Sequence, residues 1–196
     1  ALRTGAKAIN KDTNILLLGE MGIANTTSAA AVALSTFGGN AQEWVGYGTG
    51  IDEKGLKLKQ QVVAKAVDLH AQNQNSSFDI LRTVGGRELA AIAGAVLEAR
   101  HRSIPVILDG FISTAAAAAL LKDNSAALDH TLVSHLSVEP GHKKLIDAVN
   151  KKPLLNLGMR LGEASGAAVA LMIIKAAVAA HNGMATFDQA GVSANE

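Results

Sequence analysis

Two glutamates follow apolar stretches of the chain in a similar glycine-rich setting. Glu20 lies in LLLGEMGIANTT, residues 16–27, and Glu163 lies in MRLGEASGAAVA, residues 159–170. A tight turn after a strand requires glycine, but it does not require a carboxylate. A glutamate there can act as a general base, or it can compensate the dipole at a helix start for about 0.3–1 kcal/mol. Both interpretations of Glu20 and Glu163 are open on these grounds.

Glycine-rich segments beside these glutamates could bind a phosphate. Gly22 precedes the cluster NTT at 25–27, the segment GYGTG covers 46–50, and Gly110 precedes a helical stretch. Glycine allows close approach of the backbone, and amides at a helix start attract anions. Simple turns would need the same glycines. The Walker motif and G-x-G-x-x-G are both absent, and Lys59 is either a cation for this phosphate or a solvated surface lysine.

Metal chemistry is not expected. Asp109 stands alone before Gly110, so a magnesium-pyrophosphate ligand would lack the usual acidic pair. The six histidines show no H-x₃-H or H-E-x-x-H spacing, and the chain has no cysteine. His130 and His135 are five positions apart across one expected strand, so they should face opposite sides, and structural or surface roles are expected for the histidines. No G-x-S-x-G motif supports a serine nucleophile.

Composition excludes further classes. The chain has 196 residues, 18 basic and 17 acidic, with aromatics at 3%. It has no basic stripe with stacking rings, so nucleic-acid binding is not expected. The first residues have no apolar segment typical of a signal peptide, which leaves the cytoplasm as the expected location. The apolar stretch 164–180 falls short of the about 20 residues of a membrane span, so we expect a helix buried in a large core.

The elements that must position these residues alternate between short apolar runs and alanine-rich helical segments. Four runs read as fully buried strands, namely 14–19, 104–110, 131–136 and 152–158. The helical segments are 26–36, 53–72, 86–101, 113–122, 140–150 and one after Glu163. This alternation predicts one α/β domain over 1–196, with a Rossmann-like parallel sheet covered by helices on both faces. Segment 71–77 is the expected surface loop. Ligands of such sheets bind beyond the carboxyl ends of the strands, where both glutamates fall.

The whole chain resembles one enzyme family in five ordered motifs. They are GEMGIANTT (19–27), WVGYGTGIDEKGLKLK (44–59), ILDGFISTAAA (107–117), SVEPGH (137–142) and LGMRLGEASGAA (157–168). The family is that of the nicotinate-nucleotide:dimethylbenzimidazole phosphoribosyltransferases, which act in assembling the lower ligand of cobalamin. Family members carry an upstream, partly helical segment that contributes to the benzimidazole pocket. The present sequence resembles the larger C-terminal portion that follows it.

The resemblance implies a role for each candidate residue. Glu163 matches the catalytic base, and Glu20 matches a second active-site carboxylate. The residues that match positions near the ribose phosphate are Gly22, Lys59, Gly110 and Ser137. The implied substrates are nicotinate mononucleotide and 5,6-dimethylbenzimidazole, with no cofactor and no metal, in a homodimer.

Two other interpretations remain. The chain could be a truncated, catalytically impaired domain of this family that still binds phosphate or nucleotide. It could also be an unrelated sugar-phosphate enzyme with a similar sheet.

Overall fold

A parallel four-stranded sheet forms the centre of the molecule. The computed structural model describes residues 1–48 and 50–193, so residue 49 of the GYGTG segment lies outside it. The strands are β1 (Leu16–Leu18), β2 (Val106–Leu108), β3 (Thr131–His135) and β4 (Pro153–Leu155), in the spatial order β1-β2-β3-β4. Each predicted apolar run contains one strand, and the predicted α/β class is confirmed.

The helices are α1 (Leu2–Lys7), α2 (Asn25–Phe37), α3 (Ala41–Trp44), α4 (Glu53–His70), α5 (Ser77–Ile80), α6 (Arg87–His101), α7 (Phe111–Ala118), α8 (Pro140–Ala148) and α9 (Ser165–Gly183). Each predicted helical segment contains a helix, and α1, α3 and α5 lie outside the predicted segments. Short helical turns at 71–73, 81–85 and 119–122 complete the helical segments. The expected surface loop at 71–77 therefore begins with one such turn and ends where α5 starts.

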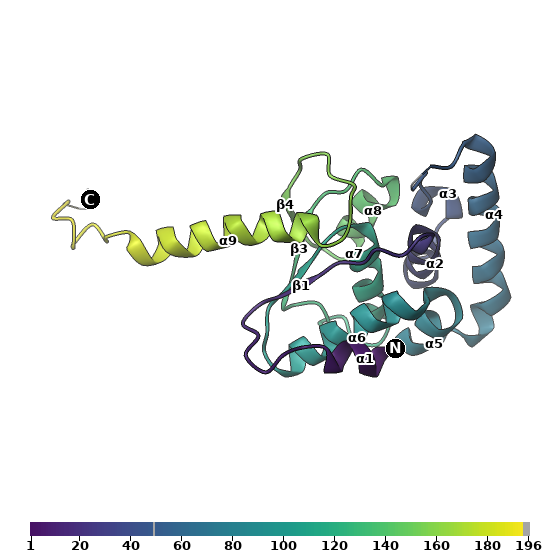
Figure 1. Ribbon diagram of the computed structural model, residues 1–196, viewed down its shortest axis with the longest axis horizontal. Helices are drawn as coiled ribbons and strands as arrows, with labels where there is room; N and C mark the ends of the chain where they lie inside the picture. The colour runs from purple at the N-terminus through teal and green to yellow at the C-terminus, as the bar shows by residue number, and fades with distance from the viewer. Residues whose placement is uncertain (49, 194–196) are drawn as a thin grey trace.

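Helices cover both faces of the sheet, as predicted (Figure 1). Successive strand residues point to opposite faces. Val106 and Leu108 pack in the main core with alanines of α2, α6 and α7, while Ile107 packs with Ala167 and Ala170 of α9 on the other face. Alanine side chains are small, so these helices lie close to the sheet.

Helix α9 corrects the expectation of a buried core helix. Only Gly166, Ala167 and Ala170 of α9 are buried, and its second half is exposed throughout. Figure 1 shows the helix leading away from the sheet as an arm. By length and composition alone α9 is also apolar enough to cross a membrane, a property that does not by itself place it in one. Its buried residues are confined to the first turns, because the sheet is too narrow to cover the rest.

Helices α1 and α6 cross at two glycines. A Cβ at Gly5 would lie 1.8 Å from the carbonyl oxygen of Ala91, and a Cβ at Gly94 would lie 2.1 Å from that of Leu2. The two helices therefore touch through their backbones, and α1 is held on the domain by this contact.

We expect Gly94→Ala to lower the free energy of unfolding by about 1–3 kcal/mol, a typical cost of overpacking. The added methyl group would force α1 away from α6. Urea-induced unfolding measures the change. Gly183→Ala is the matched control, because a Cβ there meets nothing within 4 Å and alanine favours helix. Equal stability of the Gly94→Ala variant and the wild type would contradict the close crossing.

Candidate functional site

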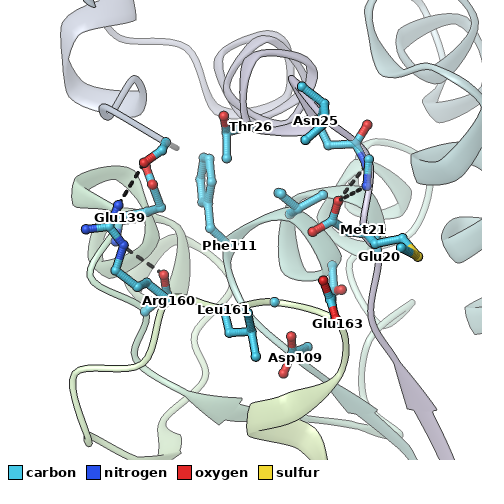
Figure 2. A pocket seen from close by; sticks show the side chains of 18 of the residues that line it. Glu20, Met21, Asn25, Thr26, Asp109, Phe111, Glu139, Arg160, Leu161 and Glu163 are labelled. Atoms are coloured by element: carbon cyan, nitrogen blue, oxygen red, sulfur yellow. Dashed lines mark hydrogen bonds between the residues drawn. The ribbon is translucent and has the colours of Figure 1, made fainter. Parts of the chain in front are cut away.

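One pocket lies at the carboxyl ends of the strands (Figure 2). Residues after β1, β2, β3 and β4 all contribute to its lining, among them Glu20, Asp109, Ser137 and Glu163. The predicted residues that line it are Glu20, Gly22, Gly110, Ser137 and Glu163. The parallel strands bring these distant segments together at one edge of the sheet, where the sequence predicted a ligand.

Helices α2 and α7 begin in the lining of this pocket, and neither has an acidic residue in its first turn. By contrast, α3, α4, α5 and α6 each carry an acidic residue there. The positive ends of the α2 and α7 dipoles therefore lie uncompensated by their own first turns, whereas the carboxylate of Asp109 accepts an amide in the first turn of α9. Such ends with their unpaired amides attract anions, which makes the pocket suitable for a phosphate.

Glu20 lies in the loop between β1 and α2. Its Oε2 accepts hydrogen bonds from the amide of Gly22 at 3.2 Å and from Nδ2 of Asn25 at 2.6 Å. Burial raises the pKa of Glu20, and these two hydrogen bonds oppose the increase. The charges of Glu88 and Asp109 raise it further. Glu20 precedes α2 by several residues, so compensation of a helix dipole in the first turn does not explain it.

Glu163 lies in the turn before α9, with an exposed side chain. It and Ala164 both have left-handed backbone conformations, with φ of 58° and 60°. Non-glycine residues rarely adopt this region, and such outliers cluster at functional sites. The amide of Glu163 donates to the carbonyl oxygen of Glu20 at 3.0 Å. The two loops that carry the glutamates are therefore bonded to each other.

Gly19 makes the approach of these loops possible. A Cβ at Gly19 would lie 2.1 Å from the amide nitrogen of Ala164 and 2.7 Å from its Cα. Because both atoms belong to the backbone, no side-chain rotation could relieve the overlap. The glycine before Glu20 is thus explained by the turn that holds Glu163.

Gly110 and Ser137 lie together on the pocket wall. Gly110 is the N-cap of α7, and its Cβ would lie 3.4 Å from Cε1 of His135 and 3.8 Å from Cβ of Ser137. The amide of Ser137 donates to Nδ1 of His142 at 3.0 Å. Burial lowers the pKa of His142 to about 3, so the ring is neutral and accepts this bond at neutral pH.

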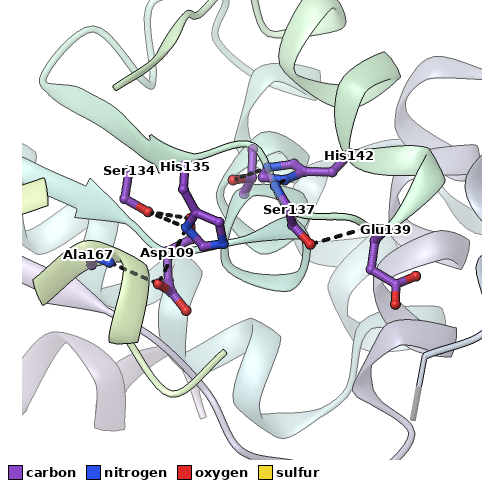
Figure 3. Close-up of polar contacts among 8 residues, drawn as sticks. Asp109, Ser134, His135, Ser137, Glu139, His142 and Ala167 are labelled. Carbon is purple, nitrogen blue, oxygen red and sulfur yellow. Dashed lines mark hydrogen bonds and ion pairs between the residues drawn. The ribbon is translucent and has the colours of Figure 1, made fainter. Parts of the chain in front are cut away.

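Asp109 and His135 form a buried network that the sequence analysis missed (Figure 3). Oδ1 of Asp109 accepts the amide of Ala167 in the first turn of α9 at 2.9 Å and lies 3.8 Å from Nδ1 of His135. Ser134 Oγ donates to the Asp109 carbonyl at 2.6 Å. The hydroxyl has one proton, so Nδ1–H of His135 donates to Ser134 Oγ at 2.9 Å. This network ties the start of α9 to the end of β2.

His135 lines the pocket, whereas His130 does not. Burial lowers the pKa of His135, and the charge of Asp109 opposes this decrease. Gly166 is required beside it, because a Cβ there would lie 2.0 Å from Nδ1 of His135. The structural or surface role expected for His135 therefore did not include its place in the pocket lining. The one usable signal in the sequence was its position at the end of a strand.

Lys59 lies behind the pocket wall and is not among the lining residues. Its Nζ donates to Oγ1 of Thr26 at 2.8 Å and to the carbonyl oxygen of Gly46 at 2.9 Å. Burial lowers its pKa, and the charge of Glu139 opposes the decrease. A solvated surface lysine is excluded, because Lys59 is 9% exposed. Lys59 holds the start of α2 and the 46–48 segment together.

Arg160 is a cation of the pocket that sequence reasoning did not single out. It lines the pocket and donates from Nη2 to the carbonyl oxygen of Gly48 at 2.9 Å. Figure 2 shows it across the pocket from Glu20 and Glu163, on the side of Glu139. Its place within MRLGE, three residues before Glu163, was the available signal. Among the residues that the structure describes, no group of three or more His, Cys, Asp or Glu could hold a metal ion.

Comparison with known proteins shows the family. The phosphoribosyltransferase family model matches residues 1–192. This chain is 56% identical to the nicotinate-nucleotide–dimethylbenzimidazole phosphoribosyltransferase of Sinorhizobium medicae, over 96% of its length. It is 54% identical to the enzyme of the same name from Brucella canis, over 98% of its length. The crystal structure of CobT from Thermus thermophilus superposes with a TM-score of 0.91 at 40% identity, over 99% of this chain.

The match covers a limited share of those relatives. The chain spans 56% and 57% of the lengths of the two sequences and 58% of the solved chain. The family model spans residues 1–192 and therefore includes every motif at the pocket. The chain therefore belongs to the nicotinate-nucleotide–dimethylbenzimidazole phosphoribosyltransferase family.

Proposed function

We propose that the protein transfers the phosphoribosyl group of nicotinate mononucleotide to 5,6-dimethylbenzimidazole, giving α-ribazole 5′-phosphate and nicotinate. One observation carries the proposal, namely the pocket in which the starts of α2 and α7, without acidic first turns, meet two glutamates on mutually bonded loops. The helix starts suit the phosphate, and the glutamates suit the chemistry at the ribose. The names of the relatives supply the substrates.

Glu163 serves as the general base in this reaction. Neutral dimethylbenzimidazole attacks through one ring nitrogen and gains nucleophilicity as the N–H at the other is removed. The exposed carboxylate of Glu163 at the pocket rim can accept that proton. General-base catalysis typically contributes about 10²–10⁴ in rate. The left-handed turn fixes the backbone that carries Glu163 before the substrate arrives.

The donor already has a good leaving group. The glycosidic nitrogen of nicotinate mononucleotide is a pyridinium, so nicotinate departs without protonation by the enzyme. Attack from the opposite face inverts C1′ from β to α. No pyrophosphate leaves, so the reaction does not call for magnesium. Glu20, half-buried beside Glu163, is placed to orient the base or to favour positive charge at C1′.

Apolar side chains at the rim suit the aromatic base. Met21 and Leu161 both line the pocket and are 75% and 70% exposed. Each is a near neighbour in sequence of a pocket glutamate. A flat aromatic ring between such side chains would gain about 25 cal/mol per Å² of apolar surface buried.

We also propose that the protein is a homodimer. The exposed apolar residues of α9 include Val169, Met172, Ile173 and Val178, and Leu132 and Leu154 are exposed on the sheet beside it. Contiguous apolar surface of this kind is typical of protein interfaces. Analytical ultracentrifugation tests the proposal, and a monomer at micromolar concentration would reject it.

A direct assay tests the function. The protein as its gene encodes it is incubated with nicotinate mononucleotide and dimethylbenzimidazole, and α-ribazole 5′-phosphate is followed by chromatography. Calorimetry measures binding of each substrate in parallel. Product formation supports the proposal. Binding of the mononucleotide without product would favour the alternative of a catalytically impaired nucleotide-binding domain, and absence of both would reject family function for this protein.

We expect Lys59→Met to raise the Kd of nicotinate mononucleotide by roughly 10- to 100-fold, since a hydrogen bond to a charged group contributes about 1.5–3 kcal/mol. Among the residues that the structure describes, Thr26 and Gly46 take two of the three ammonium donors, and we propose that the third reaches a bound phosphate from behind the pocket wall. The Kd of nicotinate riboside, which has no phosphate, should change little. Lys57→Met, at an exposed position of the same helix, is the control. Equal losses for the mononucleotide and the riboside would show that Lys59 acts only on structure.

A further inference from the structure

Asn25 joins Glu20 to a second carboxylate outside the pocket. Its Nδ2 donates to Oε2 of Glu20 at 2.6 Å and to Oε2 of Glu88 at 2.5 Å. A side-chain amide has two N–H donors, so both are used. The reverse orientation of the amide would direct its oxygen at two carboxylates, and the network therefore fixes the orientation. Glu88 lies on α6, more than 60 positions away in sequence.

Glu88 also lies against the backbone of the Glu20 loop. A Cβ at Gly22 would lie 1.9 Å from Oε2 of Glu88 and 2.4 Å from Nδ2 of Asn25. The side chain of Glu88 thus occupies the space that any larger residue at position 22 would need. Gly22 in turn donates its amide to Glu20. The hydrogen bonds that link Glu88 to Glu20 therefore run through the side chain of Asn25, and Glu88 also fills the space beside Gly22.

We propose that Glu88 is a positioning residue for Glu20, which acts through the side chain of Asn25 and fixes the Glu20 carboxylate at the mouth of the pocket. The inference rests on the proposed function, because it assigns Glu88 a task in that reaction. The residues that line the pocket do not include Glu88, so it does not touch the substrate. It holds the group that does.

A simpler role for Glu88 is compensation of the α6 dipole. It is an exposed acidic residue in the first turn of that helix, as Glu53 is in the first turn of α4. Dipole compensation would affect stability by about 0.3–1 kcal/mol and leave Glu20 unchanged. Glu53→Ala is therefore the matched control for Glu88→Ala.

The two roles differ in their effect on the charge of Glu20. Two charged groups act on Glu20, Glu88 from α6 and Asp109 from the end of β2, and both raise its pKa. Replacement of Glu88 by glutamine keeps an oxygen that accepts from Asn25 but removes the charge. The pKa of Glu20 should then fall, while its position is retained.

The experiment combines kinetics with a titration. We expect Glu88→Ala and Asn25→Ala each to lower kcat by roughly 10- to 100-fold, a loss of the size that small misplacements cause. The variant that carries both Glu88→Ala and Asn25→Ala should be no slower than Asn25→Ala alone, because both substitutions break the same link from Glu88 through Asn25 to Glu20. Glu88→Gln should restore most of kcat, and Glu53→Ala should retain it. Additive losses in the double variant, or full activity of Glu88→Ala, would overturn the proposal.

The titration is independent of turnover. Carbon-13 NMR of the glutamate carboxyl groups follows Glu20, whose signal is assigned by its absence in Glu20→Gln. A lower pKa of Glu20 in Glu88→Gln than in the wild type supports the contact, and an unchanged pKa overturns it. A wild-type protein without transferase activity would reject the proposed function, and this titration would still decide whether Glu88 acts on Glu20.

Discussion

Glu163→Gln is expected to lower kcat by at least about 10²-fold, the low end of the effect of losing a general base. The amide keeps the size and hydrogen bonding of the carboxylate, but it cannot accept the proton of the benzimidazole. The Kd of nicotinate mononucleotide should stay near that of the wild type, because the phosphate is held by other residues. Steady-state kinetics and calorimetry on the same preparation measure both quantities.

The left-handed backbone at position 163 allows a second form of this test. Glycine adopts φ near +58° without strain, so Glu163→Gly removes the carboxylate and leaves the turn intact. Added acetate should then restore part of the rate by supplying a carboxylate in solution. Glu98→Gln, on α6 and away from the pocket lining, is the control for the charge change. Near-normal kcat in Glu163→Gln would remove Glu163 from the role of base.

The elements and the position of the site were predictable because they depend on local signals. Continuous apolar runs such as 131–136 and alanine-rich segments such as 86–101 are recognisable in the local sequence, and the structure places β3 and α6 there. Strand exits then follow from the chain direction, since all four strands are parallel. Glu20 and Glu163 were found in this way.

Long-range contacts at the site were not predictable from local patterns. Asp109 was set aside as a lone carboxylate, yet its Oδ1 holds the amide of Ala167, 58 positions away. His135 was expected in a structural or surface role because the histidines lack metal-ligand spacing, although it reaches the pocket from the end of β3. The spacing of residues in the sequence predicts which face of a strand or helix a side chain lies on. It does not predict which distant segment packs against that face.

Helix α9 was misjudged for a related reason. Its composition, rich in alanine with valine, leucine and isoleucine, is that of a core helix. The composition of a helix indicates that its side chains favour an apolar environment. It does not indicate whether residues of the same chain provide that environment. The sheet buries Ala167 and Ala170 of α9 and partly covers Leu171 and Ile174, while Met172, Ile173 and Val178 remain exposed.

Gly19→Ala is expected to lower kcat by roughly 10²-fold, a loss that a displacement of about 1 Å can cause, even though position 19 carries no reacting group. The new Cβ would lie 2.1 Å from the amide nitrogen of Ala164, so the turn before α9 must move. That movement breaks the bond from the Glu163 amide to the Glu20 carbonyl and separates both carboxylates at once. Gly158→Ala, in the same connection between β4 and α9, is the matched control.

The Gly158→Ala control separates the effect of the overlap with Ala164 from the effect of backbone strain. Gly158 has a φ of +65°, and a Cβ there meets nothing within 4 Å, so its replacement costs strain without displacing a loop. Binding of nicotinate mononucleotide to Gly19→Ala should be weakened less than kcat, because the starts of α2 and α7 are not moved by the change. If Gly19→Ala and Gly158→Ala lose activity equally, the two glutamate loops do not depend on their mutual contact. A selective loss in Gly19→Ala would show that the glycine before Glu20 is there to admit the turn that carries Glu163.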